Sequence, residues 1–451
     1  MVTDEQSSAV TSVVDHLFRH ESGRMVATLT RILGFENLQL AEDVVQDALL
    51  KAMQNWAFSG IPRNRSAWLM QVARNQALDA VRRRQNFRSK EQDIAAFFED
   101  RSGGQQPADS ARFDDEIRDD QLRMMFACCH PVLPRESQVA LTLKTLCGFA
   151  EEEIAASFLV SPAAMAKRLV RARQTIRTSA IALEIPAGKD LSERVDSVLQ
   201  ALYLLFNEGY KASHGDELIR QDLCREAIRL TTLLVAHPAG NQPKTHALLS
   251  LMLLSGARLS ARVDAEGNLL LLAEQDRSRW DRAMIQRGLY HLNQSAAGDE
   301  ISEFHLEAGI AYCHCTAPSY EATDWQRILT LYDILIETNN SPVVALNRAV
   351  AISRLRGPEA GLSALERIRP RATLESYYLL HAVVAQFHFE LRDFSAAANH
   401  FQRALERTSV KAEQSFLANR LRACRAEKER RVDSLPGKPP PGIRQGAEVK
   451  T

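Results

Sequence analysis

Basic side chains gather in the middle of the chain at Lys167, Arg168, Arg171 and Arg173. No acidic residue occurs between Glu153 and Glu184, so the positive charge of this stretch is unopposed along the chain. Guanidinium and ammonium groups bind phosphates and base edges. The small residues Ala163 and Ala164 just before them would let a backbone approach a groove closely. These residue types at this spacing therefore favour contact with a nucleic acid.

The segment that carries this cluster, residues 136–177, predicts a helix-turn-helix. A first helix ends at Gly148, a short one begins near Glu151, and the chain turns at Leu159-Val160-Ser161. Ser161 suits the N-cap of the last helix and Pro162 its first position. Such a motif places the start of its second helix in the major groove, but a helical hairpin with a solvated basic face explains the same pattern. The residues expected inside the last helix are Met165, Leu169, Ala172 and Ile176.

The N-terminal part of the chain predicts three more helices. Apolar residues recur at helical spacing from residue 11, and a second helix covers residues 41–56. A loop with Gly60 and Pro62 precedes a third helix over residues 66–84. The inner stripe expected for the second helix is Val44, Ala48, Leu49 and Met53.

The length and the breaks predict an all-α protein of several units. A chain of 451 residues exceeds one ordinary domain, and no run of alternating strands occurs. Residues 101–110 are rich in Gly, Ser, Pro and Gln, as in a flexible linker. The expected organisation is a first helical unit at 10–90, a linker at 91–120, a second unit with the helix-turn-helix at 121–182, a repeat-like helical extension at 190–430 and a disordered tail at 431–451.

Composition excludes several classes of protein. The 56 basic and 56 acidic residues cancel, so only local charge can favour nucleic acid. The sequence shows no secretory signal or membrane span, and its seven cysteines are irregularly spaced. Cys128-Cys129-His130 and Cys313-His314-Cys315 lack the spacing of a zinc site. We expect a cytoplasmic protein that has no metal, no cofactor and no enzymatic activity.

Two segments together carry a family resemblance. AEDVVQDALLKAMQNW followed by RSAWLMQVARNQALDAVRRR resembles region 2 of the extracytoplasmic-function (ECF) branch of the sigma-70 family, and residues 136–177 resemble its region 4. The resemblance implies core RNA polymerase and promoter DNA as partners. It also implies that region 2 binds the −10 element and region 4 the −35 element.

The resemblance assigns roles by position. Polymerase docking falls on Asp43, Gln46 and Asp47, and capture of a −10 base on the loop 58–65. The −35 contacts fall on the basic cluster together with Ala163 and Ala164. The residues placed against the −10 strand are Trp68, Arg74, Asn75, Asp79, Arg82, Arg83 and Arg84.

Some of these assignments have alternatives. Trp68 could equally anchor its helix in the core, and the arginine triplet could be a solvated helix end. The chain also departs from the family pattern, with Leu159 where the turn usually has Gly and Ala164 where a Thr or similar residue is usual.

The long segment after residue 190 resembles the extension of a subgroup of ECF sigma factors, which ends in tetratricopeptide-like helices. Within the segment itself, the spacing of Ala385, Ala397, Phe401 and Ala404 supports a tetratricopeptide-like repeat. We interpret it as a regulatory domain that could bind a protein regulator. Within LYLLFNEGY, residues 202–210, we expect Leu202, Leu205 and Phe206 in the core, whereas core packing explains Glu208 and Tyr210 least.

Three classes of function remain. The first is a sigma factor that directs promoter recognition and transcription initiation. The second is a helix-turn-helix regulator with a repeat-type sensor domain, and the third is a repeat scaffold without DNA contact. Residues 41–84 favour the first class, because a simple regulator does not need a polymerase-docking helix.

Overall fold

The computed structural model describes residues 4–83, 119–179, 189–213, 218–265, 267–339, 341–369 and 372–433. These residues form two compact units. Unit 1 comprises Met1–His214, Ile219–Leu259 and Trp280–Ala308, and unit 2 comprises Gly215–Leu218, Ser260–Arg279 and Gly309–Thr451. The described residues contain no strand beyond an isolated bridge between Val263 and Leu269, so the all-α prediction is confirmed.

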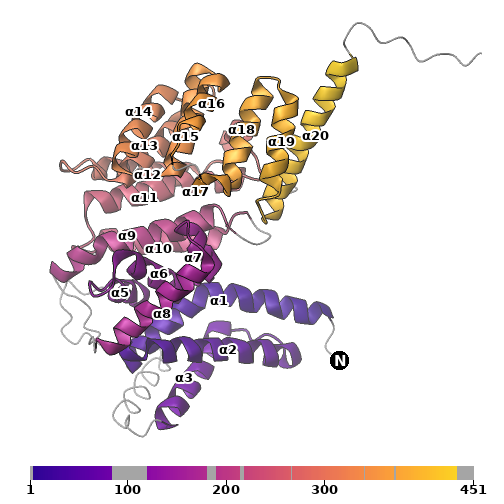
Figure 1. Cartoon of the computed structure of the whole chain (residues 1–451). Coiled ribbons are helices and arrows are strands. Elements are labelled where there is room, and N and C mark those ends of the chain that lie inside the picture. The colour runs from indigo at the N-terminus through magenta and orange to yellow at the C-terminus, as the bar shows by residue number, and fades with distance from the viewer. Residues whose placement is uncertain are drawn as a thin grey trace, which may run out of the picture. The chain divides into compact units, whose positions relative to one another are not determined.

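Unit 1 begins with a helical layer of α1 (Asp4–Leu33), the short η1 (Phe35–Asn37), α2 (Leu38–Ser59) and α3 (Arg65–Arg83) (Figure 1). The buried stripe of α2 runs from Ala41 to Trp56 at helical spacing. Gly34 and Gly60 both have positive φ, and they allow the chain to turn at the end of α1 and of α2.

The next four helices are α5 (Asp120–Cys128), α6 (Arg135–Leu146), α7 (Glu151–Ser157) and α8 (Pro162–Thr178). Two polar side chains cap them as the sequence chemistry favours. The Asp119 carboxylate accepts from the backbone N–H of Leu122 at 2.9 Å, and Ser161 Oγ accepts from that of Ala164 at 3.3 Å. The predicted helix-turn-helix is therefore present as α7, a tight turn and α8.

The turn between α7 and α8 is made by Leu159 in the left-handed conformation, with φ 53°. The N–H of Val160 donates to the carbonyl of Ala155 at 3.0 Å, and that of Leu159 to the carbonyl of Ala156 at 3.2 Å. These two bonds form a Schellman motif, whose left-handed position is usually glycine. The fold thus makes the family's turn with a strained leucine.

Unit 1 continues with α9 (Lys189–Tyr210), α10 (Gln221–Ala236), α11 (Pro243–Gly256), α12 (Arg282–Ser295) and the first residues of α13 (Glu303–Thr316). Leu202, Leu205 and Phe206 are buried, which confirms the core stripe predicted for this segment. Since α9 packs on α5 and α6, the start of the extension shares a unit with the helices that precede it (Figure 1).

Unit 2 is built from consecutive helices. After the end of α13 they are α14 (Trp325–Thr338), α15 (Pro342–Arg356), α16 (Pro358–Glu366), the single turn α17 (Ala372–Glu375), α18 (Tyr378–Glu390), α19 (Phe394–Leu405) and α20 (Lys411–Asp433). Helix α15 packs on both α14 and α16, and α19 packs on both α18 and α20. The predicted repeat residues Ala385, Ala397, Phe401 and Ala404 are all buried in one cluster between α18, α19 and α20. Helix α18 also packs on α16, where a Cβ at Gly361 would lie 2.7 Å from the Phe387 ring.

Two predicted segments fall almost wholly outside the described residues. These are the linker at 91–120, of which only Asp119 and Asp120 are described, and the tail at 431–451, of which only the end of α20 is described. No helix among the described residues has the length and apolar character that crossing a membrane requires.

Candidate nucleic-acid interface

Helix α8 has one buried and one exposed face. Its predicted inner residues Met165, Leu169, Ala172 and Ile176 are at most 3% exposed, which confirms their place in the core. The other face is open to solvent at Ala163, Ala164, Lys167 and Arg171. Val170 and Gln174 lie on this same face, and the sequence reasoning missed them although the spacing from Lys167 pointed to them.

The beginning of α8 is also suited to an anion. Ser161, Pro162, Ala163 and Ala164 are exposed, so the first turn presents backbone with little side-chain bulk. The positive end of the helix dipole lies at this turn, and it favours a phosphate group there. The start of α8 can therefore approach a nucleic-acid backbone closely.

Arg168 and Arg173 lie on the flanks of α8 and are half-buried. Arg168 pairs with Glu136 of α6 at 2.9 Å, and its guanidinium lies over the Phe158 ring at 5.7 Å from the centroid. Arg173 pairs with Glu42 of α2 at 3.1 Å. The six candidate −35 residues thus divide into four on the open face and two that are ion-paired to other helices.

Helix α2 presents a polar and apolar mixture to solvent. The candidate docking residues Asp43, Gln46 and Asp47 are all exposed, and Gln39 Nε2 donates to Asp43 Oδ1 at 2.9 Å. Leu50 and Met53 are exposed on the same helix. The prediction that Met53 lies on the buried stripe is wrong, because Ala52 and Trp56 fill that stripe instead. Exposed apolar groups beside acids suit a protein partner.

The loop after α2 and the face of α3 carry the candidate −10 residues. Phe58, in the last turn of α2 just before that loop, is 83% exposed, so its ring is accessible for stacking. Trp68 is half-buried and packs edge-on against the buried Trp56, with ring centroids 5.3 Å apart. Its anchoring role is therefore visible in the fold.

The remaining α3 residues are only partly described. Asn75 and Asp79 are exposed, and Arg74 is half-buried. Arg82 and Arg83 lie within α3, but their side chains fall outside the described residues, as does the whole of Arg84.

The cysteine pairs do not form a metal site in the described part of the chain. Cys128 and Cys129 are buried, and burial raises the pKa of the Cys129 thiol to about 12. Among the described residues no group of three or more His, Cys, Asp or Glu side chains is placed to hold a metal ion.

Three family models match the chain. Residues 17–87 match sigma-70 region 2, residues 123–176 match sigma-70 region 4, and residues 194–296 match a family of unknown function, DUF6596. The first two cover α2, α3 and the helix-turn-helix, where the candidate interface lies.

Two relatives are informative. An uncharacterised protein of Rhizobium meliloti is 38% identical over 396 residues, which cover 87% of this chain and 92% of that protein. A probable RNA polymerase sigma factor, RfaY, of Xanthomonas campestris pv. campestris is 35% identical over 140 residues, which cover 30% of this chain and 33% of that protein. No solved structure matches.

The two matched regions and the geometry of their helices define a promoter-recognition subunit, and the chain belongs to the sigma-70 family of RNA polymerase sigma factors. Within that family it is an ECF-type sigma factor with a long C-terminal extension, whose first part is the DUF6596 segment. Its sigma-70 regions imply core RNA polymerase and promoter DNA as partners.

Proposed function

We propose that this sigma factor binds the −35 element through the open face of α8. The observation that carries this proposal is the pair of exposed basic residues, Lys167 and Arg171, behind the exposed and capped first turn of the helix. That arrangement can place the first turn in the major groove and two cations on phosphates or base edges. Val170 and Gln174 add an apolar and an amide contact to the same face.

The −10 element and the polymerase are bound by the N-terminal helices in this proposal. The exposed ring of Phe58, at the end of α2, supports base capture at the junction of α2 and the loop that follows, since bases of every kind can stack on an aromatic ring. Asp43 and Asp47 beside Leu50 support docking of α2 on a basic and partly apolar polymerase surface.

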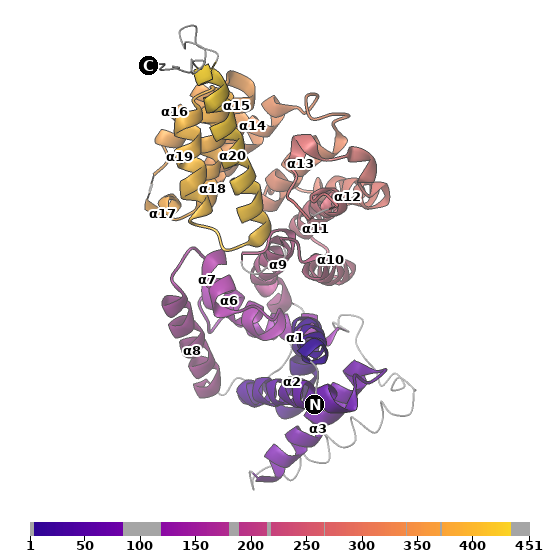
Figure 2. The ribbon, with the colours of Figure 1, turned by 90° about the vertical axis from the view of Figure 1, so that its right-hand side faces the viewer.

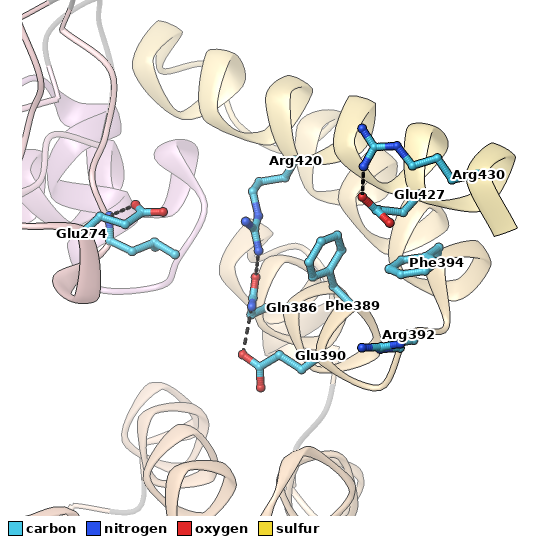
Figure 3. A pocket seen from close by; sticks show the side chains of 10 residues that line it. Glu274, Gln386, Phe389, Glu390, Arg392, Phe394, Arg420, Glu427 and Arg430 are labelled. Atoms are coloured by element: carbon cyan, nitrogen blue, oxygen red, sulfur yellow. Dashed lines mark hydrogen bonds and ion pairs between the residues drawn. The ribbon is translucent and has the colours of Figure 1, made fainter. Parts of the chain in front are cut away.

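The extension is a regulatory domain in this proposal, and it binds a protein regulator. A groove of about 1050 Å³ in unit 2 supports the second point. Figure 3 shows Arg420 reaching toward Gln386, whose amide donates to Glu390, with the Phe389 ring beside Arg420. The Arg420 guanidinium lies 4.8 Å from the centroid of that ring. A lining of arginines, glutamates and two phenylalanines suits a peptide that carries both charge and an apolar side chain.

We further propose that the protein has no enzymatic activity and no cofactor, and that it acts in the cytoplasm, where its DNA and polymerase partners are. Every candidate residue on α2, α3 and α8 has a binding role that requires no bond to be made or broken in this chain.

The experiment is run-off transcription with the purified full chain, core bacterial RNA polymerase and the promoter region upstream of its own operon. Specific transcripts are expected, and Lys167→Ala combined with Arg171→Ala should abolish them while co-elution with core polymerase persists. Arg422→Ala, an exposed arginine of α20 in unit 2, is the matched control. Absence of both transcript and co-elution would leave the helix-turn-helix regulator as the better explanation.

A further inference from the structure

One carboxylate of region 2 holds two helices of region 4. Glu42 of α2 is 7% exposed. Its carboxylate accepts from the Thr145 hydroxyl of α6 at 2.7 Å and pairs with the Arg173 guanidinium of α8 at 3.1 Å. A buried carboxylate requires such partners, because its desolvation is costly when they are missing. Figure 2 shows α8 beside α2, and these side-chain contacts make that junction specific.

A second contact between the regions requires a glycine. A Cβ at Gly23 of α1 would lie 2.1 Å from the carbonyl oxygen of Leu146, at the end of α6. The same carbonyl accepts from Gln121 Nε2 at 3.1 Å. The two backbones thus meet at a distance that no larger residue permits.

The extension joins both regions at this point. Glu226 of α10 pairs with Arg24 of α1 at 3.3 Å, and Arg229 pairs with Asp119, the N-cap of α5, at 2.7 Å. Glu226 and Arg229 also pair with each other at 2.7 Å. Through this network of ion pairs, α10 of the extension binds region 2 and region 4 at neighbouring points.

A second set of contacts fixes the extension to region 4. Arg220, 3% exposed, bridges Glu153 of α7 at 2.8 Å and Glu208 of α9 at 3.4 Å. Arg194 of α9 donates to the carbonyl of Phe126 in α5 at 3.1 Å. The extension can therefore hold region 4 firmly.

This arrangement does not allow both promoter elements to be bound at once. The −10 and −35 elements, which their names place about 25 base pairs apart, span about 85 Å of duplex at 3.4 Å per base pair. Measured from the Glu42–Arg173 contact, the remainder of α2 and of α8 extend about 42 Å together at 1.5 Å per residue, and α3 packs back on α2 instead of prolonging it. The contact must break before α8 and the loop after α2 can reach their elements on one DNA.

We propose that the structure is a closed form of the sigma factor, in which the Glu42–Thr145–Arg173 contact fixes the DNA-binding helix beside α2 and the α10 network of the extension keeps it closed. The partner of the interface is a segment of this same chain. The inference rests on the sigma function, because only promoter binding requires the regions to separate. It gives the extension a specific action, which is to restrain region 4 until polymerase or another partner shifts the equilibrium.

Two variants of the full chain weaken the interface in different ways. Gly23→Ala introduces the forbidden Cβ, although alanine favours the α1 helix. Arg229→Met removes the charge that joins Glu226 and Asp119. The control is Arg225→Met on the same helix, since Arg225 is exposed and donates to Gln221 within α10.

Two readouts are needed. Amide hydrogen exchange of the free protein should become several-fold faster at the end of α6 and in α8 for Gly23→Ala and Arg229→Met. At limiting sigma factor, run-off transcription should rise about two- to fivefold for Arg229→Met, as expected for loss of exposed ion pairs, and at least as much for Gly23→Ala. The control should match the wild type in both measurements.

Either of two results would overturn the proposal. One is unchanged exchange in both variants, and the other is faster exchange with equal or weaker transcription, since the closed contact would then belong to the active form. If the wild type neither bound core polymerase nor transcribed, the sigma function itself would fail. The exchange comparison would still decide whether the closed contact exists.

Discussion

Leu159 stores backbone strain in the turn before α8. A left-handed conformation costs a residue with a Cβ about 1–2 kcal/mol, and glycine avoids most of that cost. The Leu159 side chain is 48% exposed, so its removal sacrifices little packing. We expect Leu159→Gly to raise the free energy of unfolding by about 0.5–1 kcal/mol. This net gain is smaller than the relieved strain, because glycine has more conformational entropy to lose when the chain folds. Urea unfolding of both proteins measures this difference.

Leu159→Ala serves as the control, because alanine keeps the Cβ and hence the strain. It should be no more stable than the wild type. Equal stabilisation by both substitutions would show that the leucine side chain, and not its backbone conformation, is the unfavourable element.

Glu208 makes the stability of unit 1 depend on pH. Burial raises the pKa of this carboxyl to about 7, although the backbone N–H of Ser213 donates to it. The native state then binds more protons than the unfolded state between pH of about 4.5 and 7, so this group lowers stability as the pH rises through that window. We expect the unfolding temperature of Glu208→Gln to fall less steeply than that of the wild type as the pH rises from about 4.5 to 7. Glu152→Gln, an exposed change on α7, should leave the slope as it is.

The sequence singled out Glu208 but could not explain it. An acidic residue is unexpected on an apolar helix face, and this is what marked Glu208 as unusual in the sequence. Its partners were not predictable, because Arg220 arrives from the next helix and Glu153, which Arg220 also binds, lies 67 residues from Arg220. Local spacing identifies an unusual residue, whereas only the tertiary fold supplies its counter-charge.

At the scale of elements, α8 makes a quantitative prediction about salt. Each phosphate contact that is lost should reduce the slope of log affinity against log salt by about 1. We expect Lys167→Ala and Arg171→Ala each to weaken promoter binding by the holoenzyme and to lower that slope, with Arg422→Ala unchanged. Fluorescence anisotropy of promoter DNA at several salt concentrations measures it. A slope that stayed constant in both variants would mean that these side chains do not contact phosphates.

Helix periodicity predicted α8 well and α2 less well. The spacing of four, three and four residues gave the buried stripe of α8 correctly, because a short amphipathic helix on one core has one inner face. On α2 the longer stripe drifts around the helix, and Ala52 replaces Met53 inside. The ion pairs of Arg168 and Arg173 were not predictable, since Glu42 lies 131 residues before Arg173.

At the scale of the molecule, the order of the helical segments followed from periodicity and from the resemblance, but their assembly did not. The extension was expected as a domain separate from the sigma regions. In the structure its first helices share unit 1 with both of them, through contacts such as Arg24 with Glu226, which are 202 residues apart. Charges on exposed helix faces have many alternative partners, so sequence alone does not select among them.

This sharing predicts that the sigma regions depend on α9 for their fold. Leu191, Val195 and Leu199 of α9 are at most 1% exposed, and α9 packs on α5 and α6. A chain that ends at residue 188 would uncover that apolar surface, and exposed patches of this kind cause association. We expect residues 1–188 to aggregate or to unfold at a lower temperature, as measured by light scattering after size exclusion and by thermal melting. A chain that ends at residue 433 loses no described contact and should behave as the full chain. A monomeric and equally stable 1–188 fragment would instead establish the extension as a removable appendage, and truncation would then test its regulatory role directly.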